Sequence, residues 1–284
     1  MNPRSKIVPP TDWNAGGPPA TPRVSRRRPI KVSSGGFFVL RTHAGGSPAF
    51  QSVFRYNSYH RTFMEIYFQL ITDAEGVRNA CRDVAGEKFL GFDTETTELD
   101  PYRGDLRLVQ FSTGKATYVI DLKPFRSGGP LVSNPDLAPL RDLLSDAGKI
   151  KIAHNAKFDA KWVRHHLGAE LNGIFDTFLS SQLIAAGDSE RRHSLADVAQ
   201  FFTGTELDKS EQISDWSGEL SQSQLEYAAR DAAVMIPLRE QIEDRLKNDD
   251  LRQAAGLEFE CVMPIAQMEL NGFYLDEARW REQV

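Results

Sequence analysis

Two acidic residues follow an apolar run about a third of the way along the chain. Asp93 and Glu95 come after the segment FLGF at 89–92, which has the composition of a buried strand. Because side chains alternate between the two faces of a strand, acids that are two residues apart point to the same face. Carboxylates at such close quarters repel each other unless a cation or a proton intervenes. A divalent cation would remove this repulsion, and the alternative is an ordinary exposed strand end.

Two further pairs of polar residues are spaced for one face of a helix. Asn155 and Asp159 are four residues apart, as are Tyr227 and Asp231. Residues at this spacing are neighbours on a helix surface. Each pair taken alone also fits a partly exposed helix. His154 could be a metal ligand, but it has no second histidine at the spacing of a metal site, which favours a structural role.

Taken together, the three segments supply a set of hard oxygen ligands. Four carboxylates and a tyrosine, without a histidine or cysteine cluster, suit Mg²⁺ or Mn²⁺ better than Zn²⁺. Two such cations about 4 Å apart can activate a water molecule and stabilise the leaving oxygen when a phosphodiester is cleaved. A tyrosine has a pKa of about 10, so a role in orienting the water suits Tyr227 better than the role of a free base. The expected metal ligands are Asp93, Glu95, Asp159 and Asp231.

Short β-rich runs alternate with amphipathic helical runs from residue 64 onward, and these elements must position the polar groups. The expected strands are 67–71, 88–94, 106–112, 116–121 and 149–154. The expected helices are 73–84, 136–147, 156–167, 176–186, 194–202, 222–247 and 251–270. Three strands come close together before the first long helical connection, which favours a mixed sheet over a purely parallel one. The predicted fold class is α/β, with a mixed five-stranded sheet flanked by helices.

Residues 1–63 differ from the rest in composition. They contain eight of the fifteen prolines, and ten Lys or Arg residues against the single acid Asp12. We predict a disordered basic tail for this segment. Its cluster of Arg26, Arg27 and Arg28 is compatible with a nucleic-acid-binding tail or with an organelle transit peptide. Met64, where ordered patterning begins, is an alternative start of translation.

The remaining residues are acidic, with 24 Lys or Arg against 38 Asp or Glu. Such a surface repels a polyanion, so contacts with nucleic acid should be local and bridged by cations. Cys81 and Cys261 lack the spacing of a zinc site or a disulfide framework. No run approaches the roughly 18 apolar residues of a membrane span. We therefore expect a soluble, cytoplasmic protein without a membrane partner.

In order and spacing, these motifs resemble the Asp-Glu-Asp-Asp-Tyr 3'-5' exonucleases, and most of all the proofreading domain of family A bacterial DNA polymerases. The likeness covers about 66–248, including 91–101, the run Leu108-Val109-Gln110 and the segment 209–216. It implies a ribonuclease H-like fold and the stepwise removal of 3'-terminal nucleotides from single-stranded DNA. The first motif corresponds to Asp93 and Glu95, the second to Asp159, and the third to Tyr227 and Asp231.

The resemblance also implies roles for single residues. Asp93, Glu95 and Asp231 would hold one metal ion, while Asp93 and, through water, Asp159 would hold the other. Leu99 falls where the family places an apolar wedge against the terminal bases, and the alternative for it is an ordinary core leucine. Asn155 falls where the family contacts the substrate backbone.

The last part of the sequence resembles the segment that opens the polymerase region of family A enzymes, from 257 through the run MELNGFYLD at 268–276. We expect an exonuclease domain at 64–250 and the truncated start of a polymerase region at 251–284. The chain would then be a fragment, with a polymerase domain as its partner in the full-length chain and no polymerase activity of its own.

Two alternatives remain open. Ribonuclease D-type enzymes, which trim structured RNA, share the three motifs and a run like that from Lys209 to Trp216. Because stacking and phosphate contacts discriminate poorly between single strands, RNA ends stay possible substrates. The other alternative is a catalytically silent module that only binds nucleic acid or braces a neighbouring domain.

Overall fold

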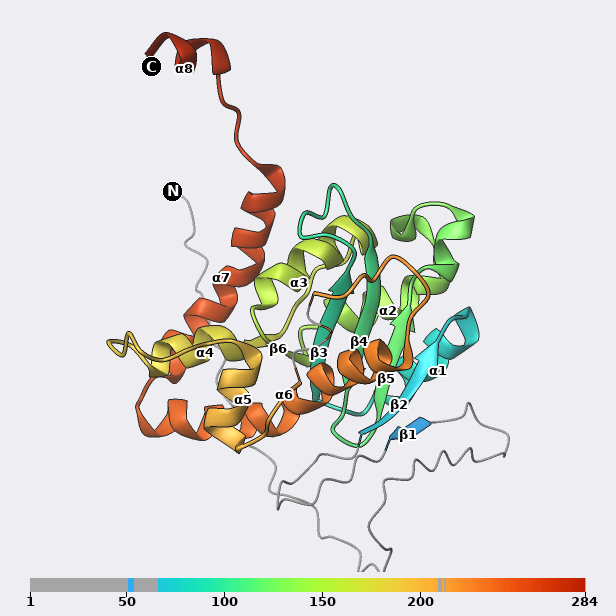
Figure 1. Ribbon diagram of the computed structural model, residues 1–284, viewed down its shortest axis with the longest axis horizontal. Helices are drawn as coiled ribbons and strands as arrows, with labels where there is room; N and C mark the ends of the chain where they lie inside the picture. The colour runs from blue at the N-terminus through green and yellow to red at the C-terminus, as the bar shows by residue number, and fades with distance from the viewer. Residues whose placement is uncertain (1–50, 54–65, 209–210, 212, 284) are drawn as a thin grey trace, which may run out of the picture. The chain divides into compact units, whose positions relative to one another are not determined.

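A mixed sheet forms the centre of the computed structural model, which describes residues 51–53, 66–208, 211 and 213–283 (Figure 1). Within this part of the chain the sheet has seven strands in the spatial order β1, β2, β5, β4, β3, β6, β7. β2 is parallel to β5, and β6 is parallel to both β3 and β7, whereas the other neighbouring pairs are antiparallel. The strands are β1 Gln51–Val53, β2 Ile66–Ile71, β3 Phe89–Thr96, β4 Leu106–Ser112, β5 Thr117–Asp121, β6 Ile150–Ala153 and β7 Ile174–Asp176.

Helices cover both faces of this sheet. On one face, α1 Ala74–Asp83, α2 Ala138–Ser145 and α3 Ala156–Trp162 share an apolar core with β3, β4 and β5. On the other face, the long helix α6 Gln222–Asn248 crosses the sheet and packs against β3 and β4 (Figure 1). The remaining helices are α4 Thr177–Ile184, α5 Leu195–Thr203, α7 Arg252–Asn271 and α8 Glu277–Gln283, with 3-10 turns at Pro124–Gly128, Leu131–Ser133 and Pro135–Leu137.

The helices that carry the predicted site residues begin and end at residues suited to those places. α6 begins with a capping box. The Ser221 hydroxyl accepts the backbone N–H of Gln224, and the Gln224 side-chain oxygen accepts the backbone N–H of Ser221. α3 passes into a π-helical turn at Val163–Leu167 and ends at Gly168, whose φ of 67° is readily adopted by glycine. These ends fix which turns face the sheet.

The predicted fold class is confirmed, and the five expected strands correspond to β2 through β6. The prediction of five strands in all was too low. β7 was missed because its three residues carry little pattern of their own and are defined by pairing with β6. Asp176 was placed in a helix but is the last residue of β7 and the N-cap of α4.

The other additional strand, β1, lies inside the segment that we predicted to be disordered. Its three residues pair antiparallel with β2, so the prediction of disorder is wrong for 51–53. Such pairing depends on a partner that local composition does not reveal. The rest of that segment, including the arginine cluster at 26–28, lies outside the described residues, as do Met64 and residues 209, 210 and 212.

α7 packs against α3 and contributes Val262 and Ala266 to the core that α1 and α2 share. Glu269 near its end pairs with Lys157 at 2.6 Å and with Lys161 at 2.8 Å. The boundary between an exonuclease domain and a polymerase region at 250 stays a prediction. Within the described residues, every helix is too short or too polar to cross a membrane.

Candidate active site

Three elements bring the four predicted carboxylates together. β3 carries Asp93 and Glu95, the first turn of α3 carries Asp159, and the middle of α6 carries Asp231. Burial raises the pKa of Asp93 well above its usual range, and the charges of the three other carboxylates raise it further. The pKa of Glu95 is raised in the same way, first by burial and then by Asp231 and Asp159. Four acids from three segments that are distant in the sequence therefore share one electrostatic environment.

Asp159 is almost fully buried, with 2% of its surface exposed. Burial raises its pKa to about 7, against the effect of the Thr94 hydroxyl, which donates a hydrogen bond of 2.6 Å to Oδ1 of Asp159. Thr94 lies between Asp93 and Glu95 in β3, so this bond ties α3 to the strand that bears two of the acids. The threonine was not singled out from the sequence, and its place inside the first motif was the available signal.

Asp231 and Tyr227 form a hydrogen-bonded pair on α6. Burial raises the pKa of Asp231 to about 7, and the bond from Tyr227 works in the opposite direction. Burial and the neighbouring carboxylates Asp231, Glu95 and Asp93 raise the pKa of Tyr227 far above its usual range. Tyr227 therefore keeps its proton at neutral pH in the metal-free protein, and its hydroxyl can donate to an acceptor or position a water molecule.

The donor set fits hard divalent cations. Each buried ionised carboxylate costs free energy unless it has a partner of opposite charge, and oxygen ligands are those that Mg²⁺ and Mn²⁺ prefer. As the side chains stand, no three His, Cys, Asp or Glu residues in the described part of the chain are arranged to hold a metal ion.

Gln110 on β4 lies directly opposite Asp93 in the strand register. Both its amide nitrogen and its amide oxygen are buried without a hydrogen-bond partner. A buried amide without hydrogen bonds lowers the stability of the folded protein. The sheet therefore keeps a polar side chain beside Asp93 although that side chain is destabilising. In the sequence, Gln110 drew attention only as part of the run Leu108-Val109-Gln110, which resembles the exonuclease family.

Asn155 stands in the left-handed region, with φ 62° and ψ 48°, at the start of α3. Asp176 holds this turn, because its carboxylate accepts the backbone N–H of Asn155 at 3.1 Å and that of Ala156 at 2.8 Å. Asp176 also caps α4 through the N–H groups of Phe178 and Leu179. A single buried carboxylate, which sequence analysis missed, therefore fixes the turn that leads from β6 to Asp159.

Leu99 is 83% exposed, so the interpretation as an ordinary core leucine is wrong. Its role as a wedge stays a prediction. His154 accepts or donates a 2.9 Å hydrogen bond with Thr177, and burial lowers its pKa to about 4. It is therefore neutral at pH 7 and held by a structural contact, in agreement with the role assigned to it.

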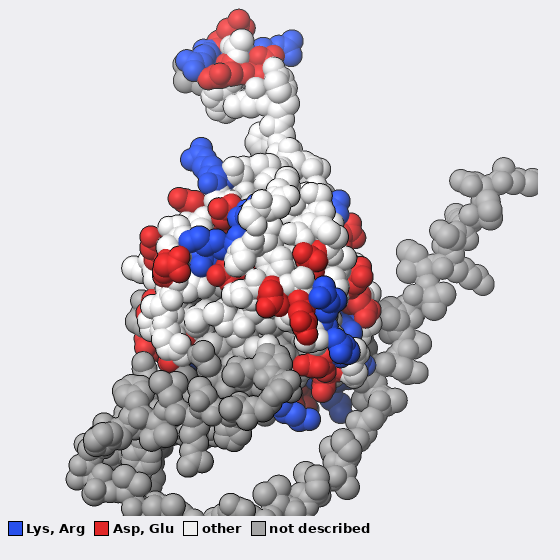
Figure 2. All heavy atoms as spheres, turned by 90° about the vertical axis from the view of Figure 1, so that its right-hand side faces the viewer, with Lys and Arg blue, Asp and Glu red and all other residues white. Residues whose placement is uncertain are grey.

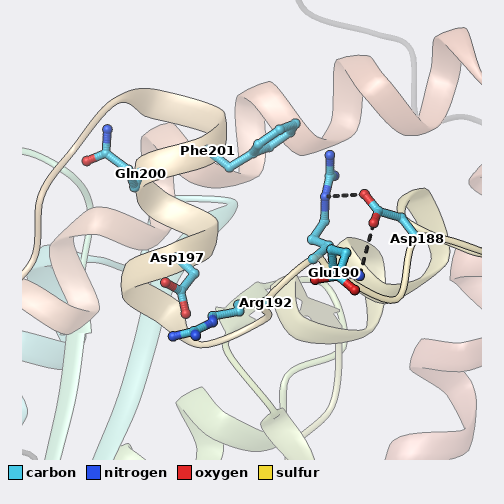
Figure 3. A pocket seen from close by; sticks show the side chains of 7 residues that line it. Asp188, Glu190, Arg192, Asp197, Gln200 and Phe201 are labelled. Atoms are coloured by element: carbon cyan, nitrogen blue, oxygen red, sulfur yellow. Dashed lines mark hydrogen bonds and ion pairs between the residues drawn. The ribbon is translucent and has the colours of Figure 1, made fainter.

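A pocket of about 430 Å³ lies away from these residues, between the turn after α4 and the helix α5 (Figure 3). The Arg191 guanidinium lies over the ring of Phe201, 3.8 Å from its centroid, and Arg191 also pairs with Asp188 at 3.9 Å. None of the predicted site residues lines this pocket, whose walls are formed by Asp188, Glu190, Arg191, Arg192, Asp197, Gln200 and Phe201.

Acidic and basic side chains are interspersed on the face of the molecule drawn in Figure 2, without a continuous basic band. Nonspecific binding of nucleic acid relies on such bands of Lys and Arg.

Comparison with known proteins gives a consistent assignment. The sequence profile of the 3'-5' exonuclease family matches residues 68–247. DNA polymerase I of Aquifex aeolicus is 33% identical over 229 residues, which cover 74% of this chain and 36% of the polymerase. Ribonuclease D of Granulibacter bethesdensis is 30% identical over 181 residues, which cover 63% of this chain and 43% of the ribonuclease. The chain thus spans less than half the length of either curated relative.

The similarity extends to solved structures. Brucella melitensis NrnC bound to pGG is 28% identical, with a TM-score of 0.61 over 73% of this chain and 95% of that chain. The same protein with bound Mg²⁺ gives a TM-score of 0.59 at 28% identity, over 72% of this chain and 93% of that chain. The family match spans more than half of the chain and contains all the residues of the three motifs. The chain therefore belongs to the 3'-5' exonuclease family.

Proposed function

We propose that this chain is a metal-dependent 3'-5' exonuclease that hydrolyses nucleotides from the 3' ends of DNA, as a proofreading activity does. Membership of the exonuclease family supports the reaction. The observation that carries the proposal is the mutual electrostatic coupling of Asp93, Glu95, Asp159 and Asp231 in one buried environment. Catalytic centres concentrate carboxylates with raised pKa values in this way.

In this proposal the carboxylates bind two divalent cations, Mg²⁺ or Mn²⁺. Asp93, Glu95 and Asp231 would hold one ion, and Asp93 with Asp159, through water, would hold the other. When bound, such ions supply an activated water and stabilise the leaving oxygen of the phosphodiester. The Mg²⁺-bound structure of NrnC supports a requirement for such a cation.

The protein side chains have separate tasks in this scheme. The protonated Tyr227, whose hydroxyl is hydrogen-bonded to Asp231, would orient the attacking water. Thr94 keeps the Asp159 carboxylate in place. Asn155, at the start of α3, would contact the substrate backbone, and the exposed Leu99 would stack against the terminal bases.

The relative DNA polymerase I supports DNA as substrate and supports a polymerase domain in the same full-length chain. RNA is the second candidate, because Ribonuclease D is similar to this chain at 30% identity. A silent binding module is the third, although all four carboxylates are retained. NrnC bound to pGG adds this short nucleotide to the substrates that a test should include.

A cleavage assay with matched substrates tests the proposal. Purified protein is incubated with 5'-labelled single-stranded DNA, RNA of the same sequence, or pGG, in Mg²⁺, Mn²⁺ or EDTA. We expect a DNA ladder that shortens from the 3' end, requires metal and is lost in the D93A variant. The D142N variant, which changes an exposed acid on α2, serves as the matched control and should retain activity. Faster shortening of RNA would favour the ribonuclease assignment, and no cleavage by folded wild-type protein would favour the silent module.

A further inference from the structure

Arg107 is a buried cation at an irregular point of the sheet. The register of β3 and β4 passes from the pair Glu95 and Leu108 to the pair Thr96 and Leu106, so Arg107 has no partner on β3. Such a bulge redirects a side chain from the regular alternation of the strand. The guanidinium is 5% exposed and binds Asp121 of β5 with two bonds, from Nε at 2.9 Å and from Nη2 at 3.0 Å.

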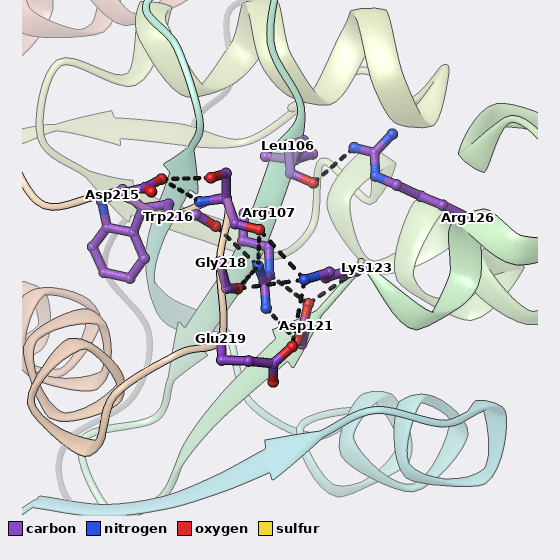
Figure 4. A network of polar contacts seen from close by, with 10 residues as sticks. Leu106, Arg107, Asp121, Lys123, Arg126, Asp215, Trp216, Gly218 and Glu219 are labelled. Atoms are coloured by element: carbon purple, nitrogen blue, oxygen red, sulfur yellow. Dashed lines mark hydrogen bonds and ion pairs between the residues drawn. The ribbon is translucent and has the colours of Figure 1, made fainter.

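The third nitrogen of Arg107 holds the segment that leads into α6 (Figure 4). Nη1 donates to the backbone carbonyls of Trp216 at 2.9 Å and Gly218 at 2.7 Å, and makes a longer bond of 3.3 Å to that of Ser217. A guanidinium can bind a carboxylate with one edge and carbonyls with another, which a lysine ammonium cannot do with the same geometry. Arg107 thus connects two strands to three consecutive carbonyls.

The same segment is also held by α6 itself. The Gln224 amide nitrogen donates to the Ser214 hydroxyl and to the Asp215 carbonyl, each at 2.9 Å. Trp216, which is buried between these two anchors, lies with its ring centroid 6.3 Å from that of Tyr227. Tyr227 is three residues after Gln224, on the next turn of the helix. The ring of Trp216 therefore forms one wall against which Tyr227 stands.

We propose that Arg107 is a positioning residue for the reaction, which acts by fixing Trp216 and thereby the hydroxyl of Tyr227. This inference rests on the proposed function, because it assumes that Tyr227 orients the attacking water. The bonds of the Arg107 guanidinium go to Asp121 and to backbone carbonyls and not to the four carboxylates, so its effect should reach catalysis through Tyr227 and leave metal binding unchanged. A purely structural brace would lower stability and affect all steps alike.

The experiment compares kcat, KM and metal affinity in a double-mutant cycle. Arg107→Met alone would leave Asp121 buried without its cation, so the R107M/D121N variant removes both charges and protects folding. We expect R107M/D121N to lower kcat about tenfold with KM within about twofold, and Y227F to lower kcat by about tenfold to a hundredfold. When all three substitutions are combined, kcat should equal that of Y227F, because the tyrosine hydroxyl is the group through which Arg107 acts.

Two controls separate the outcomes. The R126M variant removes a guanidinium beside the same strand, which donates to the Leu106 carbonyl at 3.0 Å and pairs with Asp105 at 2.9 Å. Because these bonds do not involve 214–218, the variant should leave kcat unchanged. Calorimetry with Mn²⁺ should give the wild-type affinity for R107M/D121N. The inference is overturned if folded R107M/D121N has the kcat of wild type, if its effect multiplies with that of Y227F, or if it loses Mn²⁺ affinity. A wild-type protein without exonuclease activity would instead refute the proposed function.

Discussion

Gly91 of β3 lies directly against the backbone carbonyl of Ala232 of α6. A Cβ atom added at residue 91 would stand 2.0 Å from that carbonyl oxygen and 3.1 Å from Cβ of Met235. No side chain can occupy this space unless the helix moves. Asp93 is two residues beyond Gly91 in the strand, and Asp231 precedes Ala232 in the helix. The absence of a side chain at one position therefore lets the carboxylates of two different elements approach each other.

The first prediction follows from this contact. Gly91→Ala should push α6 away from β3, destabilise the protein by about 1–3 kcal/mol through overpacking, and lower kcat at least tenfold because Asp231 moves with the helix. Urea unfolding and the cleavage assay measure the two effects. Gly86→Ala is the matched control, since an added Cβ there meets no atom within 4 Å. If G91A kept wild-type activity and stability, the close approach would not set the separation of the two acids.

Local patterning was sufficient for the elements that carry the site. The run at 106–112 is buried throughout, and its predicted bounds are those of β4. The acids of the motifs could be selected because carboxylates are unusual beside apolar runs. What could not be predicted depends on partners distant in the sequence. Gly91 is explained by a carbonyl on α6, and Arg107 by carbonyls that lie 109 to 111 residues further along the chain.

The second prediction concerns the hydroxyl of Thr94. Thr94→Val removes the 2.6 Å hydrogen bond to Asp159 but nearly preserves the shape of the side chain. Because this bond lowers the pKa of Asp159 against the effect of burial, its loss should raise that pKa further and weaken metal binding at neutral pH. We expect about a tenfold loss of Mn²⁺ affinity by calorimetry at pH 7, which corresponds to about 1.4 kcal/mol.

The control for this substitution is Thr203→Val, which removes a hydroxyl bound to the Ala199 carbonyl at 2.7 Å on α5. It should leave Mn²⁺ affinity unchanged. An affinity of T94V equal to that of wild type at both pH 6 and pH 8 would mean that the Thr94 hydroxyl does not tune Asp159.

The third prediction is a pH dependence of the metal-free protein. Asp159 and Asp231 have a folded-state pKa of about 7, above the value of about 3.9 for an unfolded aspartate. The folded protein therefore binds these protons more tightly than the unfolded chain, and the stability that they contribute is complete below pH 4 and is lost as the pH rises toward 7. In EDTA, the wild type should lose stability between pH 4 and pH 7 relative to the D159N/D231N variant.

Thermal unfolding of both proteins in EDTA, and of wild type in Mg²⁺, measures this difference. Mg²⁺ should raise the Tm of wild type more at pH 8 than at pH 5, because protons compete with the cation for the same oxygens. Parallel Tm curves for wild type and D159N/D231N across this range would contradict the raised pKa values.

The fourth prediction uses the same substitution at two buried glutamines and expects opposite signs. Gln110 has no partner for either amide atom, so Gln110→Met should stabilise the metal-free protein by about 1–3 kcal/mol, since the cost of desolvating the amide disappears. Gln224 bonds Ser214, Asp215 and the Ser221 N–H, so Gln224→Met should destabilise it by a similar amount. Urea unfolding in EDTA measures both. Methionine closely matches the length of glutamine, so opposite signs for the two substitutions would separate the contribution of hydrogen bonding from that of packing. If Q110M instead destabilised the protein, the Gln110 amide would have a hydrogen-bond partner in solution.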